Sequence, residues 1–216
     1  MPSSSVATKI LIALTGLALF GFLIIHLAGN LLVLVGPDAF NSYSHKLISN
    51  PLIYLAEAGL AAVFLIHIWK AVRNFFANRA ARPARYAVKK PAGYTSRKTL
   101  SSTTMIASGT MILVFLILHL KTFKFGAHYE AAEPGVRDLY RLTLEVFHQP
   151  GYVIWYVVAM VLVGMHLRHG VSSALQSLGA IPARTTRTIL TAGAIIAAII
   201  AGGFAMIPIW VYLFTQ

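Results

Sequence analysis

The chain has 216 residues, of which 57% are hydrophobic and 11% are charged, and its formal net charge is +12. A soluble domain of this size has no need of so much apolar surface, so the composition predicts a polytopic helical membrane protein. The absence of cysteine excludes disulfides, protein-bound iron–sulfur clusters and thiolate ligation of haem. We interpret residues 1–216 as a single all-α membrane domain.

Five apolar runs follow one another along the chain. The first, Ile10–Val35, has 26 residues without Lys, Arg, Asp or Glu. At ~1.5 Å per residue it exceeds the ~30 Å hydrocarbon core, and it is too long for a signal peptide. A short loop is predicted from Asp38 to Asn50, and the amphipathic segment Gly135–Phe147 is expected to form a helix on the membrane surface. The other four spans are predicted over residues 52–76, 103–125, 152–175 and 189–214.

Lysine and arginine are distributed unequally between the two sides of these spans. Thirteen lie before the first span, around the connector between spans two and three, or at the turn between spans four and five, and five lie on the opposite side. This asymmetry places the amino terminus inside and the carboxyl terminus outside. The connector, residues 77–102, has no aromatic side chains besides Tyr86 and Tyr94, so we interpret it as a topology signal and a docking surface for a cytoplasmic partner, not as a nucleic-acid site.

Each of the first four spans carries one histidine well inside its apolar run: His26, His67, His119 and His166. A histidine at lipid depth must face the protein interior and needs a partner. Counting along the helices puts His26 and His119 ~24 Å above the inner edge of the membrane. The same count puts His67 and His166 ~20 Å or more below the outer edge, so the two levels differ by roughly 15 Å. We therefore predict an outer pair, His26 with His119, and an inner pair, His67 with His166.

Two facing imidazoles at one level are the axial ligands that a six-coordinate b-type haem requires, and an apolar bundle provides the low-dielectric cavity. Two such haems stacked across the membrane would form an electron path. Gly16, Gly59, Gly109 and Gly164 could make room for flat rings, although glycine is also common in transmembrane packing. The alternatives are histidines that hydrogen-bond between helices, or a proton-relay transporter. Transporters usually add several acidic partners, whereas these spans contain only Glu57.

Three segments carry a resemblance to a known family: FLIIHLAGNLLVLVGPDAFNSYSHKL, NPLIYLAEAGLAAVFLIHIWKAVR and GMHLRHGVSSALQSLG. They resemble the di-haem cytochrome b subunit of succinate:quinone oxidoreductases and fumarate reductases (respiratory complex II), and the likeness extends over nearly the whole chain. The resemblance implies that His26, His67, His119 and His166 are the axial ligands of two haem b groups, with the first paired to the third and the second to the fourth.

The resemblance also implies a role in a complex of the bacterial cytoplasmic membrane. The chain would anchor a flavoprotein and an iron–sulfur subunit on the cytoplasmic side, and would relay electrons between the iron–sulfur subunit and a quinone, which we expect to be menaquinone. Dicarboxylate chemistry would then belong to the partner subunits, and the complex can form a higher oligomer. The alternative is the cytochrome b subunit of a hydrogenase, a formate dehydrogenase or a ferric reductase, which would share the haem ligands.

One position departs from a branch of this family. That branch has a glutamate two residues before the fourth ligand, linked to transmembrane proton movement. Here the position is Gly164, so the resemblance does not extend to that proton route.

Further candidate contacts lie close to the predicted haems. Arg168 and His169 follow the fourth ligand, and Lys70 and Arg73 end the second span, where a charge-assisted contact would suit a haem propionate. Lys121 and Lys124 are similar candidates. The alternative for all of them is an interfacial side chain whose charged end reaches the membrane surface.

The quinone candidates lie towards the outer side. Glu57 is six residues into its span, ~9 Å below the outer edge. A carboxylate at this depth is costly and often functional, so Glu57 is a candidate for proton exchange with a quinone. Its alternative is a protonated glutamate hydrogen-bonded within the bundle. Asn30, Tyr43 and His45 are further candidates, and His128 and His148 are expected to be solvated.

Overall fold

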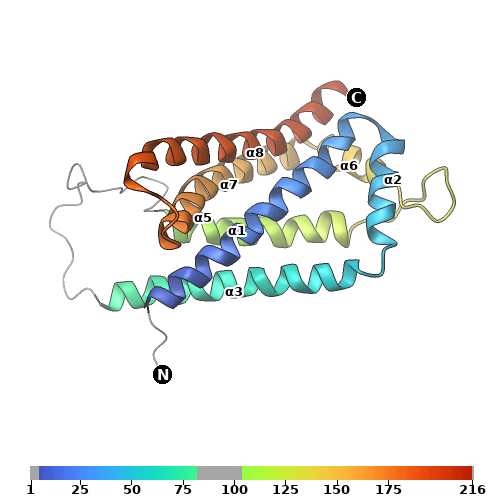
Figure 1. Ribbon diagram of the computed structural model, residues 1–216. Helices are drawn as coiled ribbons and strands as arrows, with labels where there is room; N and C mark the ends of the chain where they lie inside the picture. Colours follow the sequence, from blue (N-terminus) through green and yellow to red (C-terminus); the bar gives the residue numbers. More distant parts are fainter. Residues whose placement is uncertain (1–4, 82–103, 216) are drawn as a thin grey trace.

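The computed structural model describes residues 5–81 and 104–215, which fold into a bundle of long helices with two shorter helices across one end (Figure 1). Five helices in this described part are long and apolar enough to cross a membrane, as predicted, and this is consistent with a multi-pass membrane protein. The predicted third span begins at residue 103, and the basic connector includes Arg82, Arg85, Lys89, Lys90, Arg97 and Lys98; these positions lie outside the described residues.

The long helices keep the order of the predicted spans. They are α1 (Ser5–Asn30) with the 3₁₀ turn η1 (Leu31–Leu34), α3 (Ile53–Ala80), α5 (Met105–His119) with the π-helical turn η2 (Leu120–Lys124), α7 (Pro150–Ser177), and α8 (Thr186–Phe214), which the 3₁₀ turn η3 (Ala183–Thr185) precedes. The short helices are α2 (Pro37–Ile48) and α6 (Leu139–Phe147).

The two ends of the bundle differ. The start of α1 and the turn from α7 to α8 lie at one end, whereas α2, α6 and the end of α8 lie at the other (Figure 1). We call these the inner end and the outer end, after the orientation predicted from charge. Because α1 starts at one end and α8 finishes at the other, the described chain passes through the bundle an odd number of times, as five spans require.

Helix α7 is the centre of the packing. It contacts α8, α1 and α5, and α1 in turn contacts α3. Small and medium side chains let α7 and α8 approach closely, which is how transmembrane helices gain van der Waals contact. The buried cluster at this contact consists of Ala159, Met160, Val163, Leu167, Ala197 and Ile200. Helix α3 is the exception, because it packs mainly on α1 and has no fully buried residue.

The predicted loop after the first span is wrong, because most of it forms α2. Gly36 has a φ of 136°, which glycine tolerates, and Pro37 and Asp38 occupy the first turn of the helix. Proline suits this position because its missing N–H has no partner to bond in the first turn. The acidic side chain is stabilised there by the positive end of the helix dipole. Phe40 and Ser44 are buried on one side, so α2 lies across the outer end (Figure 1).

The predicted amphipathic helix forms only from Leu139 to Phe147 as α6, and its apolar face is buried against the bundle. Leu142, Val146 and Phe147 are buried in a cluster together with residues from α1, η1, α2, α7 and α8. Asn41 of α2 joins the two short helices: its amide donates to Asp138 Oδ1 at 2.8 Å, and its Oδ1 accepts from the Tyr140 N–H at 2.9 Å. Helices α2 and α6 therefore form one cap that covers the outer end.

An exposed cluster ties the segment before α6 to that helix. Arg141 Nε donates to Glu145 Oε1 at 2.9 Å, and the Arg141 guanidinium lies 4.2 Å from the centroid of the Tyr129 ring. A hydrogen bond from the Tyr129 hydroxyl, together with Arg141, lowers the pKa of the Glu145 carboxyl. The carboxylate form is thus favoured, and these contacts weaken only as the pH falls through that lowered pKa.

Gly164 lies where α7 and α8 are closest. A Cβ atom at this position would stand 2.9 Å from the Cβ of Ala201 in α8, and neither atom belongs to a flexible side chain. A glutamate could enter here only if the two helices separated, so the contact with α8 favours glycine at this position.

We predict that Gly164→Ala lowers the free energy of unfolding by about 1–3 kcal/mol, the usual cost of overpacking a tight contact. The control is Gly202→Ala in the exposed part of α8, where a Cβ meets no atom within 4 Å. The control should be neutral or slightly stabilising, because alanine favours helix over glycine. Thermal unfolding of the detergent-solubilised protein, followed by circular dichroism, measures both, and equal midpoints for the two variants would contradict the prediction.

Candidate functional site

The structure brings His26 of α1 and His119 of α5 together at the outer level. Their ring centroids are 5.9 Å apart and their planes are nearly perpendicular, at 89°. Aromatic side chains lie around both imidazoles; they are Phe22, Phe115, Phe123, Tyr156 and Phe204. The Tyr156 hydroxyl lies 3.1 Å from His119 Nδ1. His26 has Asn30 beside it, whose amide donates to the His26 carbonyl at 2.7 Å.

The inner level joins α3 and α7. His67 and His166 lie within electrostatic interaction range of each other. Each imidazole also meets a hydroxyl on a neighbouring helix: His67 Nδ1 lies 3.2 Å from Thr15 Oγ1 of α1, and His166 Nδ1 lies 3.1 Å from Ser108 Oγ of α5. Thr15 and Ser108 are both buried.

The two hydroxyls favour one tautomer of each imidazole. Thr15 Oγ1 lies 2.7 Å from the Leu11 carbonyl and 3.2 Å from His67 Nδ1, and Ser108 Oγ lies 3.1 Å from both the Met105 carbonyl and His166 Nδ1. When a hydroxyl donates to the carbonyl of its own helix, its oxygen accepts from the imidazole, and this arrangement favours a proton on Nδ1. The lone pair of Nε2 is then available, and a ligand imidazole typically has its other ring nitrogen engaged in this way.

The separation of the two levels follows from these contacts. Thr15 precedes His26 by 11 residues on α1, and Ser108 precedes His119 by 11 residues on α5. At the helical rise this is ~16 Å along each helix, close to the predicted difference. The structure thus places the four histidines at two levels along the bundle.

Two of the four predicted glycines lie against imidazoles. A Cβ at Gly16 would stand 3.2 Å from His67 Cε1, and one at Gly109 would stand 3.5 Å from His166 Cε1. Because glycine has no side chain, the imidazole of a neighbouring helix can approach the backbone at each of these two positions. Gly59 has no atom within 4 Å of such a Cβ, and Gly164 packs on α8.

Sequence reasoning missed the part that Ser108 and Tyr156 play beside the histidines. A repeated pattern could have revealed the first of them, because Thr15-Gly16 and Ser108-Gly109 each precede a span histidine by the same number of residues. The signal is a hydroxyl and a glycine that recur at one spacing in the first and third spans. Tyr156 has no comparable signal, since it is one of several aromatic residues in an apolar run.

Within residues 5–81 and 104–215, no group of three or more His, Cys, Asp or Glu side chains is placed to hold a metal ion. Comparison with family models, curated proteins and solved structures gave no match. Evidence about function therefore comes from the residues of this chain.

The candidates for propionate contacts do not lie together. Arg168 is half a turn away from His166 on α7 and lines a groove against α8. Lys70 Nζ lies 4.5 Å from the Trp69 ring centroid, and Arg73 is exposed on α3. His169 is half-buried and interacts electrostatically with His166.

The quinone candidates are also divided between several places. Glu57 forms an ion pair with Lys124 of η2, and both side chains are partly exposed. It is thus paired with a cation and not hydrogen-bonded inside the bundle. The Tyr43 ring packs against α1 so closely at Gly29 that a Cβ there would clash with it. Asn30 stays beside His26.

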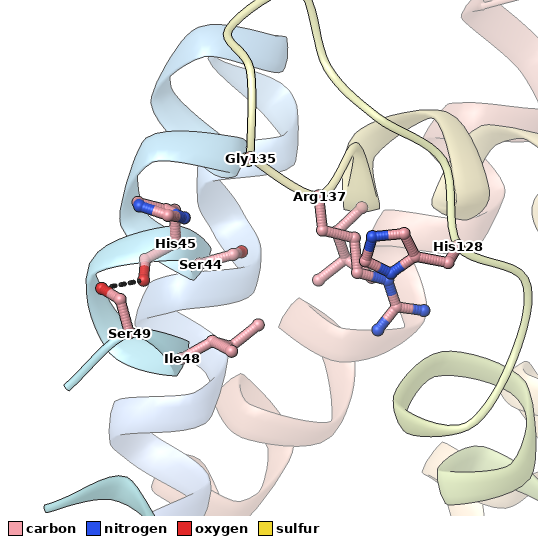
Figure 2. A pocket seen from close by; sticks show the side chains of 8 residues that line it. Ser44, His45, Ile48, Ser49, His128, Gly135 and Arg137 are labelled. Atoms are coloured by element: carbon pink, nitrogen blue, oxygen red, sulfur yellow. Dashed lines mark hydrogen bonds between the residues drawn. The ribbon is translucent and has the colours of Figure 1, made fainter. Parts of the chain in front are cut away.

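His45, the remaining quinone candidate, lines a cavity of about 320 Å³ at the outer end. In this cavity Ser44 and Ile48 of α2 face His128 and Arg137 across the space (Figure 2). The Arg137 guanidinium donates to the carbonyls of Lys124 and Ala127, at 3.4 and 2.9 Å. Burial lowers its pKa, and these two hydrogen bonds give Arg137 a structural role in closing the end of η2.

Among the histidines expected to be solvated, His128 is exposed at that cavity. His148 is half-buried instead, and its Nε2 lies 3.0 Å from Thr215 Oγ1 at the end of α8. The fold of the outer cap, which brings the start of α7 to the end of α8, explains this difference.

We predict that Thr15→Val changes the tautomer balance of His67, because the variant keeps the side-chain shape and removes the acceptor. A hydrogen bond of about 1 kcal/mol corresponds to about a fivefold change in the ratio of Nδ1–H to Nε2–H forms. Nitrogen NMR of histidine-labelled protein in membranes measures this ratio. Thr110→Val is the matched control, because the Thr110 hydroxyl is exposed and donates to the Ile106 carbonyl in its own helix. An unchanged His67 signal in Thr15→Val would remove Thr15 from the site.

Proposed function

We propose that this chain is a di-haem cytochrome b that serves as the membrane anchor of a succinate:quinone oxidoreductase or fumarate reductase. The observation that carries the proposal is the arrangement of four imidazoles as two pairs at two depths, each pair joining two helices. Hydroxyls on α1 and α5 lie at Nδ1 of His67 and His166, and this contact favours the tautomer whose Nε2 can bind a metal ion.

The residues fit the proposed cofactor. A metal ion bound by two imidazoles needs its other ligands from elsewhere, and a porphyrin supplies them itself. His26 and His119 would hold one haem, and His67 and His166 the other. When bound, the haems supply one-electron redox chemistry between the two membrane surfaces. The protein contributes the orientation of the imidazoles, the aromatic surround of the outer pair, and the exclusion of water by the outer cap.

The exposure of α3 supports the same proposal. This helix carries His67, yet it contacts the bundle mainly through α1 and buries no side chain completely. A flat apolar group held between α3 and α7 would cover the side of α3 that faces the bundle. The glycine at position 16 lets the His67 ring lie against α1 at the edge of this region.

The proposed partner subunits and the proposed membrane orientation are inferred from the sequence. The excess of lysine and arginine favours an inside amino terminus, and the resemblance of three segments favours a flavoprotein and an iron–sulfur subunit at the inner end. In this arrangement the chain lies in a bacterial cytoplasmic membrane, and dicarboxylate chemistry occurs in the partners. Glu57, held by Lys124 a few residues beyond His119, is the candidate for proton exchange with menaquinone.

The deciding experiment is an absorption spectrum of the purified complex before and after addition of succinate. We expect a reduced b-type spectrum with succinate, and two haems per chain in a pyridine haemochrome assay. A colourless, folded preparation made with haem available would reject the cytochrome proposal and favour a histidine-based transporter. Reduction by formate or hydrogen, but not by succinate, would assign the chain to another membrane oxidoreductase.

We further predict that His119→Ala loses one haem per chain and keeps the other, since the two pairs lie ~16 Å apart along α1 and α5. His166→Ala should lose the other haem. In a redox titration of haem absorbance, each variant should lack a different one of the two transitions. His128→Ala, which changes an exposed histidine at the outer cavity, serves as the control and should keep both. If either His119→Ala or His166→Ala loses both haems, or keeps both, the proposed pairing of the histidines is wrong.

A further inference from the structure

An open groove of about 750 Å³ lies at the inner end, between α7 and the first half of α8. Three arginines and two threonines line its end nearest the turn between the helices, and apolar side chains line the rest. The lining residues are Arg168, Arg184, Thr186, Arg187, Leu190, Thr191, Ala194, Ile195 and Ala198. None of the four predicted haem ligands belongs to this groove.

Among the described residues, no ion pair joins any of the three arginines to a carboxylate. The sequence contains six acidic residues, and all of them belong to α2, the start of α3 or the segment 130–145; they are Asp38, Glu57, Glu130, Glu133, Asp138 and Glu145. These elements lie at the outer end, and both ion pairs found in the described residues are there as well. Arg168, Arg184 and Arg187 are exposed at the opposite end. The groove is therefore an uncompensated cationic site.

The groove also extends into the apolar part of α8. Ala194 and Ala198 follow Arg187 by seven and eleven residues, so they share its side of the helix. The distance from Arg187 to Ala198 along the axis is ~16 Å, about half of the hydrocarbon thickness. Small side chains at both alanines leave space against the helix. An occupant that fills the groove must therefore have an anionic head and an apolar tail.

We propose that this groove binds an anionic phospholipid of the inner leaflet, with its phosphate between Arg168, Arg184 and Arg187. One acyl chain lies along α8 past Ala194 and Ala198. Basic pockets between transmembrane helices on the cytoplasmic side suit such headgroups. A protein partner at the inner surface would contact the arginines of the turn but would not reach Ala198, so the depth of the groove favours a lipid. The proposal does not depend on the haem proposal.

The test compares binding of phosphatidylglycerol and phosphatidylcholine with identical acyl chains, measured by native mass spectrometry of the full chain with its co-purified subunits in detergent. We expect preference for phosphatidylglycerol, and a loss of about fivefold in affinity for each arginine changed in Arg168→Gln, Arg184→Gln and Arg187→Gln. The charge-matched control for each double variant of these arginines is the combination of Lys9→Gln and Arg79→Gln, which are exposed inner-end positions outside the groove. It should keep the preference.

A second pair of variants tests the apolar half without a change of charge. Ala194→Phe fills the groove and should weaken phosphatidylglycerol binding, whereas Ala192→Phe, on the exposed part of α8 outside the lining, should not. Equal binding of the two lipids, or equal effects of the groove and control variants, would overturn the proposal. Competition by inorganic phosphate with no effect of Ala194→Phe would show an anion site without a lipid tail. Loss of partner subunits, with lipid binding unchanged, would identify a protein interface and also overturn the proposal.

Discussion

The hydrogen bond between a buried hydroxyl and a histidine Nδ1 is the interaction on which the candidate site depends. Thr15 and Ser108 can donate to carbonyls of their own helices and accept from the facing imidazole. Such a contact orients the ring and favours the Nδ1–H tautomer at no cost in charge, which matters at a depth where an unpaired polar group is expensive. The same contacts determine the helix neighbours, because α3 meets α1 at Thr15 and α7 meets α5 at Ser108.

The rest of the fold supports these two contacts. The close contact of α7 and α8 holds α7 in place, with Gly164 at its narrowest point. The cap made by α2 and α6 closes the outer end over the aromatic surround of His26 and His119. Charge is also distributed unequally between the two ends of the bundle. The carboxylate side chains lie at the outer end, which the cap covers, and the arginine groove lies at the inner end. A bundle with this polarity has one end suited to an acidic or anionic neighbour and another end where carboxylates and cations lie together.

Much of this arrangement could be predicted from the sequence, since hydropathy and the helical rise are enough to place five spans and to sort four histidines by depth. Contacts that depend on which face of a helix a residue occupies were harder to predict. Arg168 follows His166 by two residues but points towards α8, because neighbouring positions on a helix do not share a face. The quinone candidates were chosen by depth, and depth alone did not bring Glu57 and His45 together. Helix α2 was missed because its polar residues suggested a loop, although Gly36-Pro37-Asp38 contained a helix-start signal.

The helices that carry the histidine pairs bear on how the protein is made. Each pair takes one imidazole from the residues before position 82 and one from the residues after position 103, so neither pair exists in the first two spans alone. During synthesis the outer pair is complete once α5 has entered the membrane, whereas the inner pair must wait for α7. Any group that both rings of a pair bind would then connect the two halves of the polypeptide, and at the inner pair it could be added only after the fourth span has been synthesised.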